Sequence, residues 1–423
     1  MRADSRAAAI AAALVSVAAL LLAVPSLAAA ASPPITTQAA AADAAFLAYA
    51  PPPASGAQAL CLVDTGVNPT PDTVPGLVSA TAINDGPPTD VDPLLHGTID
   101  AAIAGGVGHG ILGAWPQLKI VSVRATDVPS PGQHPTFQFD DYSSGVTRCV
   151  KQSVPGVRVL AVDLPLSSVI PPTPDQAREF ADSVAQAQAS GIAILAAAGN
   201  DPGPVQLPGS QPGVLAVGAG DAANAACPFS ATGGLTFYAP GCGIDQIDGR
   251  GETFCCGNGT SQASAFAAGV LVAMRSYKPE MTGAQAVQHL LSTTRNGHLD
   301  VAAAFRAAGL DGIVDAGTAS IPKEAAPAPI SAGRPVSTTR RVPRPSVKRV
   351  TWRRGVLEVV LKSMPKGARL HARITFARRK PLSIGGSRIK LRSKMPLPRG
   401  VALSHTRDGV SSATVRPKIT RLH

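Results

Sequence analysis

From residue 59 to about residue 310 the sequence alternates short apolar runs with helical segments, and this order restricts the fold more than any other feature. The apolar runs are five or six residues long, which is typical of buried strands. A strand–helix–strand order favours a parallel sheet covered by helices on both faces. We therefore expect an α/β fold whose functional residues gather at the carboxyl ends of the strands. The expected strands cover residues 59–63, 118–123, 157–162, 191–196 and 213–217, and a helix is expected over residues 174–189.

Charge divides the chain into two parts. Residues 320–423 contain 25 Lys and Arg against three acidic residues, a net charge of +22, whereas the rest of the chain carries −11. Such an asymmetry indicates a domain boundary. Residues 319–346 are rich in Pro, Ala, Ser and Arg without apolar periodicity, as linkers are. We therefore expect one large domain over residues 59–318, followed by a linker.

The basic region over residues 347–423 contains two strand patterns, at residues 356–361 and 370–376. The second pattern alternates apolar and polar residues, and a turn signal at residues 365–367 separates the two. We expect a small basic, β-rich C-terminal domain. A partly ordered basic extension is the alternative.

The first 31 residues have the order of regions found in secretory signals. Two arginines come first, an apolar run extends from Ala7 to Val24, and small residues follow Pro25. We expect cleavage near Ala31, a short N-terminal extension over residues 32–58, and a secreted protein. Because the apolar run is long for a signal, an uncleaved membrane anchor is the alternative.

Six cysteines fit an oxidising compartment, where an even number suggests disulfide bonds. Six cysteines allow 15 pairings, and the sequence does not choose among them. Their spacing contains no pair of the CxxC type, so a zinc site is not indicated.

Three short motifs contain the residues of an activated nucleophile: an acid, a histidine and a serine. Asp64 ends an apolar run and begins an Asp-Thr-Gly triplet, His96 begins a His-Gly-Thr triplet, and Ser261 opens an alanine-rich helix. Each motif alone has a common structural explanation. An Asp-Thr-Gly triplet occurs in turns, a single histidine is often solvent-facing or satisfied in a core, and a serine at a helix start is often an N-cap.

The order Asp, His, Ser along the chain is that of subtilisin. With the landmarks around these motifs, the chain resembles the subtilisin-like serine peptidases (the subtilase, or S8, family) over most of residues 60–310. That resemblance implies a subtilisin-like three-layer fold with a central parallel sheet. The landmarks lie at residues 110–113, 118–124, 196–200, 213–219, 229–230, 239–241 and 297–301.

The resemblance also implies a role for each matching residue. Ser261 would be the nucleophile, His96 its general base and then acid, and Asp64 the group that orients the imidazole. Asn200 would donate its side-chain amide to the oxyanion. The function implied is that of a secreted serine endopeptidase working through an acyl-enzyme intermediate. By the same resemblance, substrate backbone would pair with the segment of Leu164, Pro165 and Leu166.

Four departures from the family pattern support a second hypothesis. Asp100 stands where a small apolar residue is usual, Pro165 lacks an N–H for substrate pairing, and Ala265 replaces a proline. About thirty residues separate the expected signal cleavage from Asp64, so we expect folding without an attached pro-domain, or with help in trans. The alternative function is a catalytically weak or inactive subtilase-fold protein that binds peptide or cell-surface polymer.

We expect no cofactor; calcium is possible by the resemblance, but no acidic loop identifies a site. The expected partners are a protein or peptide substrate and an anionic cell-wall or membrane surface, bound through the basic region. Docking of the basic region on the acidic domain, or no partner at all, are the other options. A secreted protein meets little nucleic acid, so none is expected.

Overall fold

The computed structural model of the protein describes residues 35–130, 134–168 and 171–322, together with the backbone of the strands between residues 346 and 421. The expected signal over residues 1–31 lies outside the described residues, as do residues 323–345 of the expected linker. Within the described part of the chain, no helix is long and apolar enough to cross a membrane.

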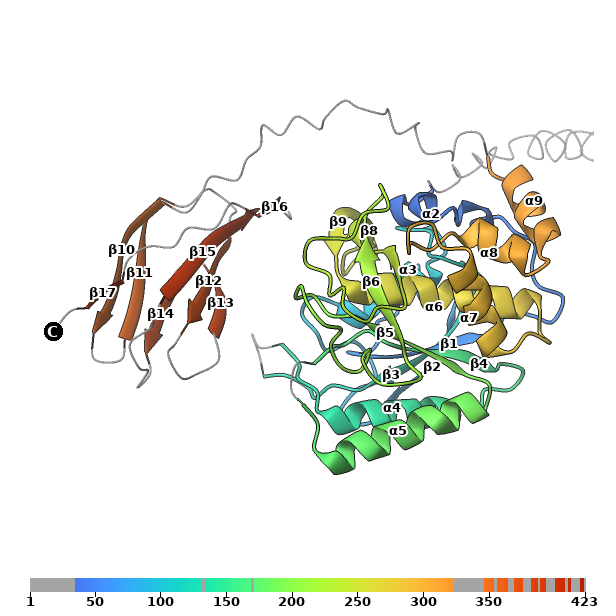
Figure 1. The fold of residues 1–423 in the computed structure, drawn as a ribbon, viewed down its shortest axis with the longest axis horizontal. Coiled ribbons are helices and arrows are strands. Elements are labelled where there is room, and N and C mark those ends of the chain that lie inside the picture. Colours follow the sequence, from blue (N-terminus) through green and yellow to red (C-terminus); the bar gives the residue numbers. More distant parts are fainter. Residues whose placement is uncertain are drawn as a thin grey trace, which may run out of the picture.

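A seven-stranded parallel sheet forms the centre of the large domain (Figure 1), in the order β2-β3-β1-β4-β5-β6-β7. The five strands expected from apolar runs are present and correspond to β1, β3, β4, β5 and β6. The other two, β2 and β7, lie at the two edges of the sheet. The strands are β1 Ala59–Asp64, β2 Leu77–Ala82, β3 Lys119–Arg124, β4 Val159–Leu164, β5 Ala193–Ala197, β6 Leu215–Gly220 and β7 Phe237–Pro240.

Helices cover both faces of this sheet, as the strand–helix order predicted. Alternate residues of β1 enter two different cores: Leu60 and Leu62 pack with helices α3 and α6, whereas Cys61 and Val63 pack with α4 and α5. Figure 1 shows α4 and α5 together on one side of the sheet. The helices are α2 Thr37–Ala41, η1 Ala45–Ala48, α3 His96–Gly105, α4 Phe139–Val150, α5 Pro174–Ala189, α6 Thr260–Tyr277, α7 Gly283–Ser292, α8 Val301–Ala307 and α9 Asp311–Ala319.

The six cysteines form three disulfide bonds. Cys61 on β1 is joined to Cys149 on α4, and Cys227 is joined to Cys242. The third bond joins the adjacent residues Cys255 and Cys256. The last two cysteines lie in an antiparallel hairpin, made of β8 Cys242–Ile247 and β9 Thr253–Asn258, that leads directly into α6.

The C-terminal region contains two four-stranded sheets, in the orders β14-β11-β10-β17 and β13-β12-β15-β16. The strands expected at residues 356–361 and 370–376 overlap β11 and β12, which belong to different sheets and do not pair with each other. The turn expected at residues 365–367 lies outside the described residues. The strands are β10 Ser346–Arg353, β11 Val356–Ser363, β12 Arg369–Thr375, β13 Leu382–Gly386, β14 Ile389–Arg392, β15 Gly400–Arg407, β16 Val410–Ser411 and β17 Ile419–Arg421.

Candidate active site

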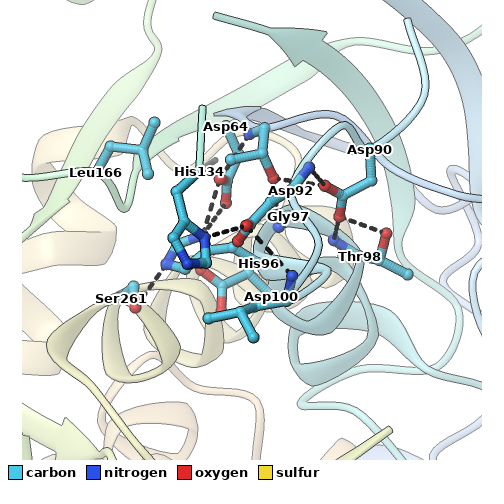
Figure 2. A network of polar contacts seen from close by, with 12 residues as sticks. Asp64, Asp90, Asp92, His96, Gly97, Thr98, Asp100, His134, Leu166 and Ser261 are labelled. Carbon is cyan, nitrogen blue, oxygen red and sulfur yellow. Dashed lines mark hydrogen bonds and ion pairs between the residues drawn. The ribbon is translucent and has the colours of Figure 1, made fainter. Parts of the chain in front are cut away.

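Of the three residues singled out in the sequence, the histidine lies within hydrogen-bonding distance of both the acid and the serine. Nδ1 of His96 is 2.8 Å and 3.1 Å from the two carboxyl oxygens of Asp64, and Nε2 is 3.1 Å from Oγ of Ser261. Figure 2 shows the histidine between the other two side chains. Each residue comes from a different element, respectively β1, α3 and α6. Residues up to 197 positions apart in the sequence are thus brought together by the fold (261 minus 64).

Asp64 is the last residue of the central strand β1, and its side chain is 1% exposed. The backbone N–H of Thr65 donates to Asp64 Oδ1 at 2.6 Å, which fixes the carboxylate beside the strand end. The hydroxyl of Thr65 in turn accepts from the backbone N–H of Gly97, directly after the histidine. A Cβ on Gly97 would lie 2.2 Å from the carbonyl oxygen of Gly66, so only glycine allows this approach.

Asp90, which was not among the residues expected from the sequence, joins the loop after Asp64 to the start of the helix that carries His96. Its Oδ1 accepts from the hydroxyl of Thr65, and its Oδ2 accepts from the backbone N–H and the hydroxyl of Thr98. These bonds satisfy an otherwise free N–H in the first turn of α3. Figure 2 shows this contact between Asp90 and Thr98. The threonines of the two triplets were the sequence signal for it, because their hydroxyls require partners.

Ser261 lies in the first turn of α6, and its side chain is 4% exposed. Backbone N–H groups in the first turn of a helix have no partner within the helix, and the helix dipole makes this end attractive to negative charge. The backbone N–H of Ser261 is therefore suited to stabilise an oxygen anion that develops close to the serine hydroxyl.

Asn200 follows the end of β5 and is exposed. Its hydrogen bonds determine how its side-chain amide is oriented. Its Oδ1 accepts from the backbone N–H of Thr260 and from the Thr260 hydroxyl, both at 2.9 Å. A backbone N–H can only donate, so the oxygen of the amide must face Thr260 and the NH2 group must face away. Gly199 has a φ of 109°, and a Cβ there would lie 2.4 Å from the Gln206 side chain. This glycine makes the turn that presents Asn200.

The segment expected to pair with substrate follows β4. Leu164 is 0% exposed and packs in the core between the sheet and α4 and α5, and Pro165 is also buried. Leu166 is half-buried, and its carbonyl oxygen accepts from the Tyr142 hydroxyl at 3.0 Å. Of the three side chains, only that of Leu166 can therefore contact a ligand directly without rearrangement.

Two further carboxyl groups are buried close to the histidine. Asp100 lies one turn after His96 on α3, is 0% exposed, and has Oδ2 3.7 Å from His96 Nδ1. Asp163 on β4 is also 0% exposed and accepts from the Ser264 hydroxyl of α6. Burial raises the pKa of Asp100 to about 8 and raises the pKa of Asp163 well above its usual value.

Opposing influences act on the histidine. Burial lowers the pKa of His96, but the negative charges of Asp64 and then Asp100 outweigh it, so that the net shift is upward. The ring still has 26% of its surface exposed. The environment therefore favours the charged imidazolium more than water does.

Among the described residues, one group has ligand atoms close enough together to hold a metal ion. It consists of Asp64, His96 and Asp100. The hydrogen bond of 2.8 Å between His96 Nδ1 and Asp64 fills the space where such an ion would lie. Calcium prefers six to eight oxygen ligands, which this group with one imidazole does not provide. We assign no metal to it.

Comparison with known proteins identifies relatives of the large domain. The model of the Subtilase family matches residues 56–310. The minor extracellular protease Epr of Bacillus subtilis (strain 168) is 28% identical over 232 residues, which are 53% of this chain and 33% of that protein. The alkaline elastase YaB of Bacillus sp. (strain YaB) is 29% identical over 242 residues, 56% of this chain and 59% of the elastase. The chain thus spans between a third and three fifths of the length of these two relatives.

Solved structures share the fold at lower identity. The MycP3 protease from the type VII (ESX-3) secretion system gives a TM-score of 0.54 at 21% identity, covering 64% of this chain and 88% of that one. A protease from Pseudoalteromonas arctica PAMC 21717 gives a TM-score of 0.53 at 21% identity, covering 64% of this chain and 94% of that one. These likenesses support the expected three-layer fold of the large domain.

Proposed function

Because the chain belongs to the subtilase family, we propose that it is a secreted serine endopeptidase that cleaves peptide bonds in protein substrates. The observation that carries this proposal is the series of hydrogen bonds from Asp64 through His96 to Ser261. A nucleophile, a base within reach of it and a group that orients the base are what hydrolysis of an amide requires.

In the first half of the reaction, Ser261 Oγ attacks the carbonyl carbon of the scissile bond while Nε2 of His96 accepts the hydroxyl proton. The charged His96 then donates that proton to the leaving amine, and the acyl group stays on Ser261. In the second half, a water molecule attacks the acyl-enzyme and His96 again takes and returns a proton. Asp64 holds the Nδ1 proton and stabilises the imidazolium throughout.

The negative oxygen of the tetrahedral intermediate needs donors that are already in place. The NH2 group of Asn200 and the backbone N–H of Ser261 are the two that we propose. The contact of Asn200 Oδ1 with Thr260 turns the amide nitrogen outward, and Thr260 directly precedes the serine. Leu166 is the residue that we propose to contact the substrate beside the cleavage site.

Secretion and surface binding are proposals that rest on the sequence. The extracellular relative and the signal-like first 31 residues support export. The net charge of +22 over residues 320–423 supports binding to an anionic cell-wall or membrane surface. If so, retention of the secreted protein on an anionic polymer should be lost when the salt concentration is raised, since salt screens such attraction. Retention that is unchanged by salt would contradict the surface proposal.

Hydrolysis of a denatured protein by the secreted chain tests the proposed activity. Ser261→Ala and His96→Ala should each lower kcat by several orders of magnitude, about 10⁶-fold for the serine. Folding is checked by circular dichroism. If the Ser261→Ala chain cleaves as fast as the wild type, the assignment of the nucleophile is wrong. If the well-folded wild type cleaves nothing, the alternative of a peptide- or polymer-binding protein is favoured.

A further inference from the structure

Asp100 is a carboxyl group for which the proposed mechanism has no use. It is 0% exposed, and its oxygens meet no donor in good hydrogen-bond geometry within the described part of the chain, although the Gln262 side chain lies close enough to lower its pKa. Its ion-pair partner is His96, at 3.7 Å from Oδ2 to Nδ1, four residues earlier on the same helix. A buried carboxylate without a partner is strongly disfavoured, so Asp100 is stable as an ion only while His96 is charged.

The surroundings of this pair are acidic. Asp64 already occupies Nδ1 of His96 with its hydrogen bond, and His134, the other histidine nearby, is paired with Asp92. Figure 2 shows these carboxyl groups around the histidine. The side chains that face Asp100 or His96 are Asp64 from β1, Asp90 and Asp92 from the loop before α3, Asp163 from β4, and Gln262 from α6.

Asp100 and His96 can hold a single proton in two ways. When the proton is on Asp100, His96 is neutral and Nε2 can accept the proton of Ser261. When the proton is on His96, the imidazolium lies between two carboxylates and cannot act as a base. Both arrangements have the same net charge, but they differ completely in reactivity.

We propose that Asp100 is a positioning residue that acts through His96: its carboxylate holds the imidazole in the charged form and thereby confines the reactive, neutral histidine to alkaline pH. This inference rests on the proposed function, because it concerns the base of that reaction. The close approach of the two side chains and the complete burial of Asp100 support it. The upward shift of the His96 pKa, to which the charge of Asp100 contributes after that of Asp64, agrees with it.

The pH dependence of kcat/KM tests the proposal. Asp100→Asn removes the charge at nearly constant shape, and Asp100→Val replaces the carboxyl by an apolar group. Without the carboxylate the histidine loses its proton at a lower pH. The acid limb of the kcat/KM profile should therefore move to lower pH by about one pH unit or more. The plateau at alkaline pH should change little, because Asp64, His96 and Ser261 remain.

Ile103→Val is the matched control, since Ile103 is buried on the same helix and its change removes a methylene but no charge. If the role of Asp100 is purely structural, its two variants should behave like Ile103→Val: the free energy of unfolding falls and the acid limb of the pH profile stays in place. An acid limb that is unmoved in both Asp100 variants, or moved to higher pH, would overturn the proposal.

A measurement that needs no catalysis separates this proposal from the proposed function. In Ser261→Ala protein, the titration of His96 is followed by NMR of labelled histidine, with His96→Ala used to assign the signal. Adding Asp100→Asn should lower the pH at which His96 titrates by about one unit or more. If this shift occurs but the chain with Ser261 intact cleaves no substrate, the function is wrong and the pairing is right. Normal cleavage without the shift refutes the pairing alone.

Discussion

At the scale of single residues, the orientation of Asn200 is decided by one neighbour. The backbone N–H and hydroxyl of Thr260 both donate to its Oδ1, so the amide nitrogen is directed away from the helix start. The residue that precedes the serine thus orients the group that we propose to bind the oxyanion.

Asn200→Ala should lower kcat by about 10²- to 10³-fold, because one donor to the developing charge is removed. KM should change little, since the donor acts mainly in the transition state. Steady-state kinetics on a peptide substrate measures both. Asp201→Ala, an exposed neighbour in the same turn, is the control and should behave as wild type. An equal loss in both variants would assign the effect to the turn and not to the amide.

Asp163 makes the stability of the fold depend on pH. Burial raises its pKa well above 3.8 in the folded chain, whereas in the unfolded chain it keeps a usual value. The folded state therefore binds the proton more tightly, and the contribution to stability is complete below the unfolded-state pKa of 3.8 and is lost as the pH rises towards the folded-state pKa. Asp163→Asn, which can keep the contact with Ser264, should accordingly gain stability relative to wild type as the pH rises.

Urea unfolding of both proteins at a series of pH values between 4 and 8 checks this sign. The midpoint difference should grow in favour of the asparagine variant with increasing pH. A difference that is constant, or that grows in favour of wild type, would mean that Asp163 is ionised in the folded protein.

At the scale of elements, α3 is fastened to the end of β1 through Asp90. Its carboxylate accepts hydrogen bonds from the hydroxyl of Thr65, directly after β1, and from the backbone N–H and hydroxyl of Thr98 in α3. The histidine and its acid partner therefore lie on two elements that are held in one geometry.

Asp90→Ala should lower the free energy of unfolding by about 1–3 kcal/mol, because buried donors lose their acceptor. It should also lower kcat, since the helix that carries His96 is less precisely placed. Denaturant unfolding and kinetics on the same preparation check the two effects. Unchanged stability together with unchanged kcat would show that this connection is dispensable.

The disulfide bonds allow a comparison between two pairs. Cys61 and Cys149 are 88 residues apart in sequence, so their bond restricts the unfolded chain, whereas Cys255 and Cys256 are adjacent and close no loop. Replacing the first pair by alanine should cost about 2–4 kcal/mol, and replacing the second should cost far less. Denaturant unfolding of the two double variants gives the comparison. Equal losses would contradict the loop-closure argument.

The elements that were predictable are those with a local signal. The helix over residues 174–189 has the predicted bounds, because Thr173 and Gln176 form a capping box and Pro174 occupies the first turn. The helix α4 was missed, since its sequence contains Gly and several Ser and Thr residues that favour other structures. Packing of Tyr142, Val146 and Cys149 in the core stabilises it instead.

At the scale of the whole molecule, the fold brings distant segments to one edge of the sheet. The proximity of Asp64, His96 and Ser261 was predictable, because each lies next to a strand end or helix start with a recognisable motif. The network around them was not. Asp90 lies in a loop rich in Pro and Asp without a periodic pattern, and the burial of Asp163 and Asp100 depends on segments far away in sequence.

Covalent labelling of the secreted chain by a fluorophosphonate, followed by peptide mapping, tests directly whether Ser261 is activated by His96 and Asp64. We expect one modified residue, Ser261, and no labelling in Ser261→Ala or His96→Ala protein. Labelling of another residue, or of the wild type and the His96→Ala variant alike, would show that Asp64, His96 and Ser261 do not form an activated nucleophile.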